Sequence, residues 1–161
     1  MTSMARSPQE GKSVWLGGLG VEIKISSQQT GGVFSLVECS LEPGRLVPPH
    51  VHTREDEYSY VLEGEIGIRI GDQIIQATPG CTVVKPRGIP HTFWNAGPQP
   101  ARTLDPIAPG GFETYFLELA ELFRTGAFEQ VETLGARYGL ARFMDWVPEL
   151  TTRYQLKLLG Q

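Results

Sequence analysis

The sequence predicts a mainly β protein, a sandwich or barrel, that carries helices at its C-terminal end. Short runs with the length and β-branched content of strands fill residues 13–111. Turn residues separate these runs, because most of the 19 glycines and 12 prolines fall between residues 11 and 111. After Gly110 and Gly111 the apolar residues recur at intervals of three and four, which is typical of helices.

Several short strands are expected within the β region. Gly71 and Asp72 stand alone between two strand-like runs and suit a two-residue hairpin turn. Many short strands with frequent turn signals favour a sandwich or barrel. The expected strands are residues 21–26, 32–42, 57–64, 65–70, 73–78, 81–86, 91–95 and 101–108.

Helical segments are expected after the β region. Residues 112–126 place apolar side chains at helical spacing, and Gly126 suits the C-terminal end of that helix. Residues 127–139 predict a second helix. Residues 143–160 predict either a third, short helical segment or an irregular tail, because Pro148 interrupts the pattern.

The chain is expected to form one domain, because 161 residues suffice for one core and no linker divides it. Residues 1–12 are expected to be a disordered lead and residues 13–111 a β-barrel. Residues 112–161 are expected to be a helical extension that packs on the outside of the same domain.

Composition excludes several classes of protein. The net charge is −4 and the basic residues are scattered, so nucleic acid is not an expected partner. No apolar run is long enough to span a membrane, and the polar N-terminus lacks a secretory signal. We therefore expect a cytoplasmic protein, in which Cys39 and Cys81 are reduced and buried.

The three histidines are candidate metal ligands. His50 and His52 are two apart, so on a strand their side chains point to the same face. His91 lies in another strand-like run and can join them if it faces the same interior. Glu55, Asp56 and Glu57 are the nearby acids. Glu57 is favoured, because it begins the next apolar run and a strand would hold it in place.

Two gapped motifs resemble the signature of the cupin superfamily. Residues 44–64 read G-RLVPP-HVH-TRED-E-YSYVLE-G, and residues 80–95 read G-CTVVK-PRG-IP-H-TFW-N. Every fixed position of the two cupin motifs is matched. The spacing to Gly64 also selects Glu57 over Asp56 as the carboxylate. The resemblance implies a jelly-roll barrel (a double-stranded β-helix) that holds one metal ion through His50, His52, Glu57 and His91.

This ligand set suits one divalent transition metal per chain, either Fe, Ni, Mn, Co, Cu or Zn, and it does not suit calcium. Four protein ligands leave positions open for a substrate oxygen, a water or dioxygen. Residues near the motifs are mainly apolar, which favours an apolar or aromatic substrate. Phe93 and Tyr60 are expected on the wall of the substrate pocket, and Asn95 is expected to cap a turn.

The outline of the chain resembles quercetin 2,3-dioxygenase-like cupins, including the PGGFE stretch before the first helix. The resemblance implies an oxidoreductase, a dioxygenase that opens the ring of a metal-activated enolate, with Glu57 accepting the substrate's proton. The alternatives are a non-redox isomerase, cyclase or decarboxylase, and a small-ligand-binding cupin without turnover. By resemblance to other small cupins we expect a homodimer, in which residues 14–26 could pair across a two-fold axis.

Overall fold

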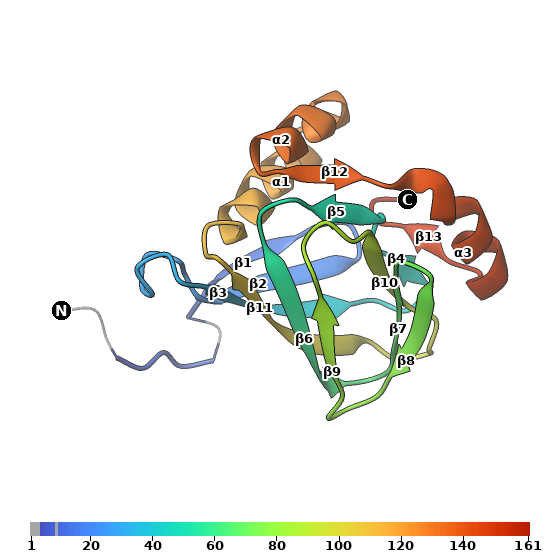
Figure 1. Cartoon of the computed structure of the whole chain (residues 1–161), viewed down its shortest axis with the longest axis horizontal. Helices are drawn as coiled ribbons and strands as arrows, with labels where there is room; N and C mark the ends of the chain where they lie inside the picture. Colours follow the sequence, from blue (N-terminus) through green and yellow to red (C-terminus); the bar gives the residue numbers. More distant parts are fainter. Residues whose placement is uncertain (1–3, 9) are drawn as a thin grey trace.

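The computed structural model describes residues 4–8 and 10–161 and contains two β-sheets that face each other, with helices beside them (Figure 1). The described residues before Lys12 contain neither helix nor strand. The predicted disordered lead falls partly outside the described residues, because residues 1–3 and 9 are not among them. Its disorder stays a prediction.

The first sheet has six strands, and each strand is antiparallel to its neighbours. In β3 and β11, buried and half-buried residues alternate, as expected when one face of a sheet covers a core. The strands, in spatial order, are β1 (Lys12–Trp15), β2 (Leu19–Ile25), β3 (Ser35–Leu41), β11 (Ala101–Ala108), β6 (Asp56–Glu63) and β9 (Thr82–Lys85).

The second sheet has seven strands and contains the hairpin that the sequence predicts. Gly71 sits in its turn with a φ of 53°, a backbone conformation that favours glycine. The main path is β12 (Leu140–Arg142), β5 (His50–His52), β10 (His91–Asn95), β4 (Arg45–Leu46) and β13 (Lys157–Leu158), while β7 (Ile66–Ile70) pairs with β10 and with β8 (Gln73–Ala77).

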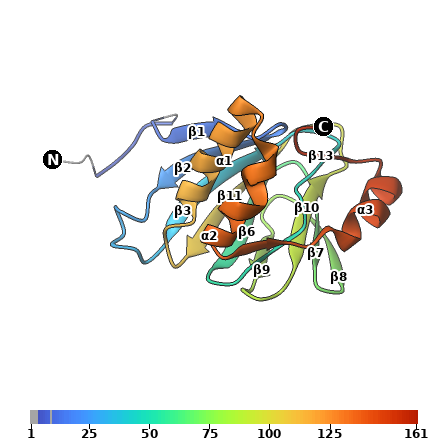
Figure 2. The ribbon, with the colours of Figure 1, turned by 90° about the horizontal axis from the view of Figure 1, so that it is seen from above.

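Residues 112–161 form helices and also complete the second sheet. The helices are α1 (Glu113–Thr125), α2 (Val131–Arg137) and α3 (Val147–Tyr154), with short 3-10 turns at Phe128–Gln130 and Met144–Trp146. Helix α1 packs across β1 and β3 on one side of the barrel (Figure 2). The helices lie outside the barrel as expected, but the same segment also contributes two strands that were not predicted, β12 and β13, which pair with β5 and β4.

Local signals account for the ends of these helices. Gly126 adopts a left-handed conformation (φ 75°) and its N–H donates to the Leu122 carbonyl, so it ends α1 as predicted. Pro148 lies in the first turn of α3, where a missing N–H costs nothing. The third segment is therefore a helix that begins at Val147 and includes the proline in its first turn. Among the described residues, no helix has the length and apolar character needed to cross a bilayer.

Strand β1 pairs with β2 of the same chain and forms one edge of the first sheet. The segment that was expected to pair across a two-fold axis thus has a partner on one side within its own chain. Asn95 caps a turn as predicted, because its side-chain amide donates to the Leu41 and Gln99 carbonyls and its Oδ1 accepts from the Gly97 N–H.

Candidate metal centre

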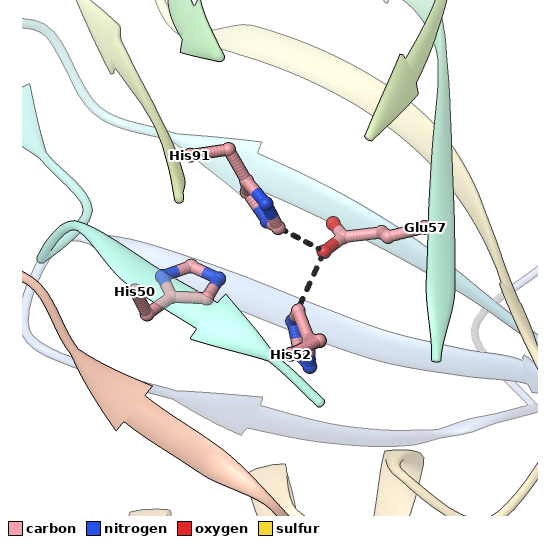
Figure 3. Close-up of side chains that lie close together, drawn as sticks. All are labelled: His50, His52, Glu57 and His91. Atoms are coloured by element: carbon pink, nitrogen blue, oxygen red, sulfur yellow. Dashed lines mark hydrogen bonds and ion pairs between the residues drawn. The ribbon is translucent and has the colours of Figure 1, made fainter. Parts of the chain in front are cut away.

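Four side chains from three strands converge inside the barrel (Figure 3). His50 and His52 come from β5, and His91 comes from β10, where it lies directly across from His50 in the antiparallel pair. Glu57 comes from β6 of the opposite sheet. One ligand atom from each of the four residues lies within 4.8 Å of the others.

The strand pattern explains why these side chains meet. The backbone of β5 turns His50 and His52 to one face, as their spacing of two predicts. Alternation along β6 turns Glu57 inward together with Ser59 and Val61. The side chains of His52 and His91 are almost fully buried, and Glu57 is 8% exposed.

Two of the three imidazoles are oriented by a backbone carbonyl at the Nδ1 atom. His50 Nδ1 lies 2.7 Å from the Pro48 carbonyl, and His91 Nδ1 lies 3.4 Å from the Ile89 carbonyl. Both Nδ1 atoms therefore carry the proton, which leaves the lone pair on Nε2. The Nε2 atoms of His52 and His91 lie 3.3 and 3.2 Å from Glu57 Oε2.

The surroundings favour neutral imidazoles at two of the three positions. Burial, reinforced by the neighbouring imidazoles His91 and His52, holds the pKa of His50 well below its usual 6.5. Burial also lowers the pKa of His91, against the opposing effect of Glu57. For His52, burial acts to lower the pKa, but the carboxylates of Glu55 and Glu57 outweigh it and raise the pKa.

The three neighbouring acids have three different surroundings. Glu57 faces the imidazoles, as predicted. Glu55 lies behind His52, with its Oε2 3.5 Å from Nδ1, and neither atom has a closer hydrogen-bonding partner among the described residues. Asp56 points to the surface and forms an ion pair with Arg87. Glu55 can thus hold the His52 ring so that Nε2 faces the other ligands.

A buried lysine beside Glu57 was not predicted. Lys85 from β9 is 1% exposed, and its Nζ lies 2.5 Å from Glu57 Oε1. Burial alone would raise the pKa of Glu57, but Lys85 together with His52 and His91 holds it well below 4.5. The sequence carried a signal, because alternation in residues 81–86 places Val83 and Lys85 on the same face.

This donor set fits a divalent transition metal. Two imidazoles are held neutral, all three have an accessible Nε2, and one oxygen of an ionised carboxylate lies between two of them. Nitrogen-rich sites with one carboxylate suit the first-row metals from manganese to zinc. The second oxygen of Glu57 is bonded to Lys85, so only Oε2 is available as a ligand.

A cavity of about 350 Å³ opens beside the four residues, and His50, His52 and Glu57 are part of its wall. Most of the remaining wall is apolar and comes from the barrel, from α1 and from the C-terminal residues 158–161. Phe93 lines the cavity. Tyr60 does not line the cavity, so that prediction was wrong. It is three residues from Glu57 on β6, so its side chain points to the opposite, outer face, where it is 43% exposed.

The same features occur in a known family. Residues 37–107 match the model of the family described as Cupin domain, and this segment contains all four converging residues. The two-sheet barrel is shared with solved cupin-fold structures. Residues 37–107 are therefore a cupin domain.

Relatives of this chain differ in what their names describe. The tetracenomycin polyketide synthase protein TcmJ of Streptomyces glaucescens is 29% identical over 109 residues, which cover 68% of this chain and 69% of TcmJ. The structure of the polyketide cyclase RemF from Streptomyces resistomycificus is 29% identical, with a TM-score of 0.57, and the match covers 66% of this chain and 80% of RemF.

Plant relatives match a shorter segment. The rhicadhesin receptor of Pisum sativum is 37% identical over 86 residues, which cover 50% of this chain and 39% of the receptor. This chain thus spans about two fifths of that relative's length.

Proposed function

We propose that this cupin is a metal-dependent enzyme acting on an apolar, aromatic or polycyclic substrate that carries an enolisable oxygen. The observation that supports it most is the position of the four converging residues beside an apolar cavity, with three of them on its wall. A cavity of about 350 Å³ is within the range of small-molecule sites, and polar groups gathered at one place fix the orientation of an apolar ligand.

His50, His52, Glu57 and His91 would hold the metal. A bound divalent ion would supply Lewis-acid chemistry, lowering the pKa of a substrate hydroxyl next to a carbonyl. Aromatic side chains of the cavity wall would orient the rest of the substrate. Phe93 and Phe112 present aromatic surface beside the site, and Phe112 stacks edge-to-face on His52 at 4.4 Å between ring centroids. These rings exclude water and favour a flat substrate.

Glu57 is better suited to be a ligand than a proton acceptor. Its pKa is held well below the usual value, and a base with a low pKa accepts a proton weakly near neutral pH. Its Oε1 is also occupied by Lys85. The sequence led us to expect that Glu57 accepts the substrate's proton. That transfer requires that the contact of Glu57 with Lys85 or with the metal be weakened.

Two reactions of such an enolate are candidates. The similarity to TcmJ and RemF, both named for polyketide chemistry, favours a non-redox ring closure or isomerisation. Oxygenation with ring opening, as in quercetin 2,3-dioxygenases, is the second candidate. It is supported by the resemblance in the sequence and by the three-histidine, one-glutamate donor set.

Product analysis under air and under nitrogen separates the two reactions. The purified protein, loaded in turn with each candidate metal, is incubated with flavonols, β-diketones and aromatic polyketide mimics. Ring closure predicts a product that forms without oxygen, whereas oxygenation predicts oxygen uptake and a product that gains both oxygen atoms. His91→Ala should abolish either reaction, and Ile74→Ala, at an exposed position on β8 away from the site, is the control. Metal-dependent binding without any turnover would favour a ligand-binding protein instead.

A further inference from the structure

The cavity has one cationic side chain on its wall. Among the described residues that line it, Arg142 is the single lysine or arginine, and Glu57 is the single acid. Glu57 already faces Lys85 and the imidazoles, so its charge is compensated inside the barrel. Arg142 therefore adds a positive charge to the cavity wall that no acid inside the cavity balances.

The strand register aims Arg142 at the same space as the metal ligands. Strand β12 pairs antiparallel with β5, and Arg142 lies directly across from His50, while Leu140 lies across from His52. Side chains of directly opposed residues project from the same face of a sheet, with Cβ atoms about 5 Å apart. Leu140 and Arg142 both line the cavity and Ala141 between them does not, although the Arg142 side chain is itself 35% exposed at the cavity's edge.

The guanidinium of Arg142 retains free donors. Its Nε lies 3.4 Å from Glu132 Oε1, a carboxylate whose side chain is 68% exposed. No other hydrogen bond or ion pair involves the Arg142 side chain within the part of the chain that the structure describes. The two terminal nitrogens are therefore available, and they present the planar pair of donors that binds carboxylates bidentately.

A second unpartnered polar group lies nearby. Tyr115, on α1, is 6% exposed and lines the cavity, and within the described residues its hydroxyl makes no hydrogen bond. Arg142 lines the same cavity, so both groups face the space that a ligand would occupy. Burial raises the pKa of Tyr115 to about 12, so the hydroxyl stays protonated and can donate. The hydroxyl is not among the fully buried unpartnered atoms, so it can be reached from the cavity and can donate to a ligand there.

We propose that Arg142 and the Tyr115 hydroxyl form an anion-binding subsite, and that the substrate is an aromatic acid. In this arrangement one end of the substrate presents its enolisable oxygen to the metal ligands, and a carboxylate or acidic phenol elsewhere on the scaffold contacts Arg142. The proposal rests on the proposed function, because it assigns a second recognition point within the same cavity.

A matched pair of ligands tests the subsite. The probes are 3-hydroxyflavone and its derivatives with a carboxylate at the 3′ or 4′ position, which differ in charge but share the enolisable oxygen. Binding is measured by titration calorimetry to the zinc-loaded and the metal-free protein. The wild type should bind at least one of the carboxylates about tenfold more tightly than 3-hydroxyflavone, the size of effect expected for a charge-assisted bidentate contact.

Three variants assign the effect to named groups. Arg142→Met keeps the apolar stem and should remove the preference for the acid, with less than about a twofold change for 3-hydroxyflavone. Tyr115→Phe should weaken the acid several-fold without abolishing the preference. Arg153→Met, on the exposed face of α3, is the control and should bind like the wild type. Melting curves check that each variant is folded.

Each outcome decides one of the two proposals or both. Two results overturn the subsite and leave the proposed function standing. In the first, 3-hydroxyflavone binds in a metal-dependent way and neither acid binds more tightly. In the second, the preference for the acid survives in Arg142→Met. Preferential binding of the acids to both metal-free and zinc-loaded protein supports the subsite but counts against the metal-dependent function. If none of the ligands binds, both proposals fall.

Discussion

Replacing Lys85 by methionine tests how the metal centre is balanced electrostatically. Lys85 and Glu57 form an ion pair whose side chains are 1% and 10% exposed, with 2.5 Å between Nζ and Oε1. Methionine fills a similar volume but leaves Glu57 as a buried carboxylate without its cation. Removing one partner of a buried ion pair costs about 3–5 kcal/mol, because the remaining charge is uncompensated.

Metal binding should recover part of this loss. In the variant, Glu57 has lost the positive charge of Lys85 at its Oε1 atom. A divalent ion bound at the three imidazoles would replace part of that charge at Oε2. The metal-free variant should therefore lose about 3–5 kcal/mol of unfolding free energy, and the zinc-loaded variant clearly less. Equivalently, zinc should stabilise Lys85→Met more than it stabilises the wild type.

Urea denaturation of metal-free and zinc-loaded protein measures both quantities. The control is Lys24→Met, whose ion pairs with Glu22 and Glu38 lie on the surface with the lysine 27% exposed, and it should cost at most about 1 kcal/mol. A loss in Lys85→Met as small as that of the control would refute the reasoning. So would an equal loss with and without zinc, because it would show that Lys85 and the metal do not act on the same carboxylate.

Two further predictions concern other acids. Glu55→Gln should weaken metal binding about 10–100-fold in a competition titration, because His52 loses the carboxylate that orients its ring, whereas Asp56→Asn should leave the affinity unchanged. Glu113 accepts hydrogen bonds from the backbone N–H groups of Ser27 and Gly111. Burial alone would raise the pKa of Glu113 above 4.5, but the hydrogen bonds at Ser27 and Gly111 outweigh burial and lower the pKa. Its contribution is therefore complete above pH 4.5 and disappears as the pH falls through the lowered value, so Glu113→Gln should cost about 1–3 kcal/mol at pH 7 and progressively less in acid. A pH-independent loss would contradict this account.

Much of the architecture was predictable because it is encoded locally. The hairpin at Gly71, the helix end at Gly126 and the strands expected between residues 21 and 108 each depend on turn chemistry or on a short apolar pattern. Strands β12 and β13 were missed because they contain three and two residues and exist through pairing with distant strands. No local pattern identifies a strand of that length.

The candidate site was predictable to a similar extent. The spacing of the two motifs identified four candidate metal ligands, and the structure places all four together: His50, His52, Glu57 and His91. Tyr60 was misplaced, although its phase relative to Glu57 already put it on the outer face. Arg142 was not identified, because its place in the cavity follows from pairing between residues far apart in the chain.

The central claim is that three histidines and one glutamate hold one divalent transition metal per chain. Elemental analysis of native wild-type protein and of His91→Ala, with circular dichroism to verify the fold, tests it most directly. The account predicts close to one transition-metal ion per chain in the wild type and its loss in the folded variant. Equal metal content in the two proteins, or a folded wild type that retains none of the six candidate metals after loading and dialysis, would contradict it.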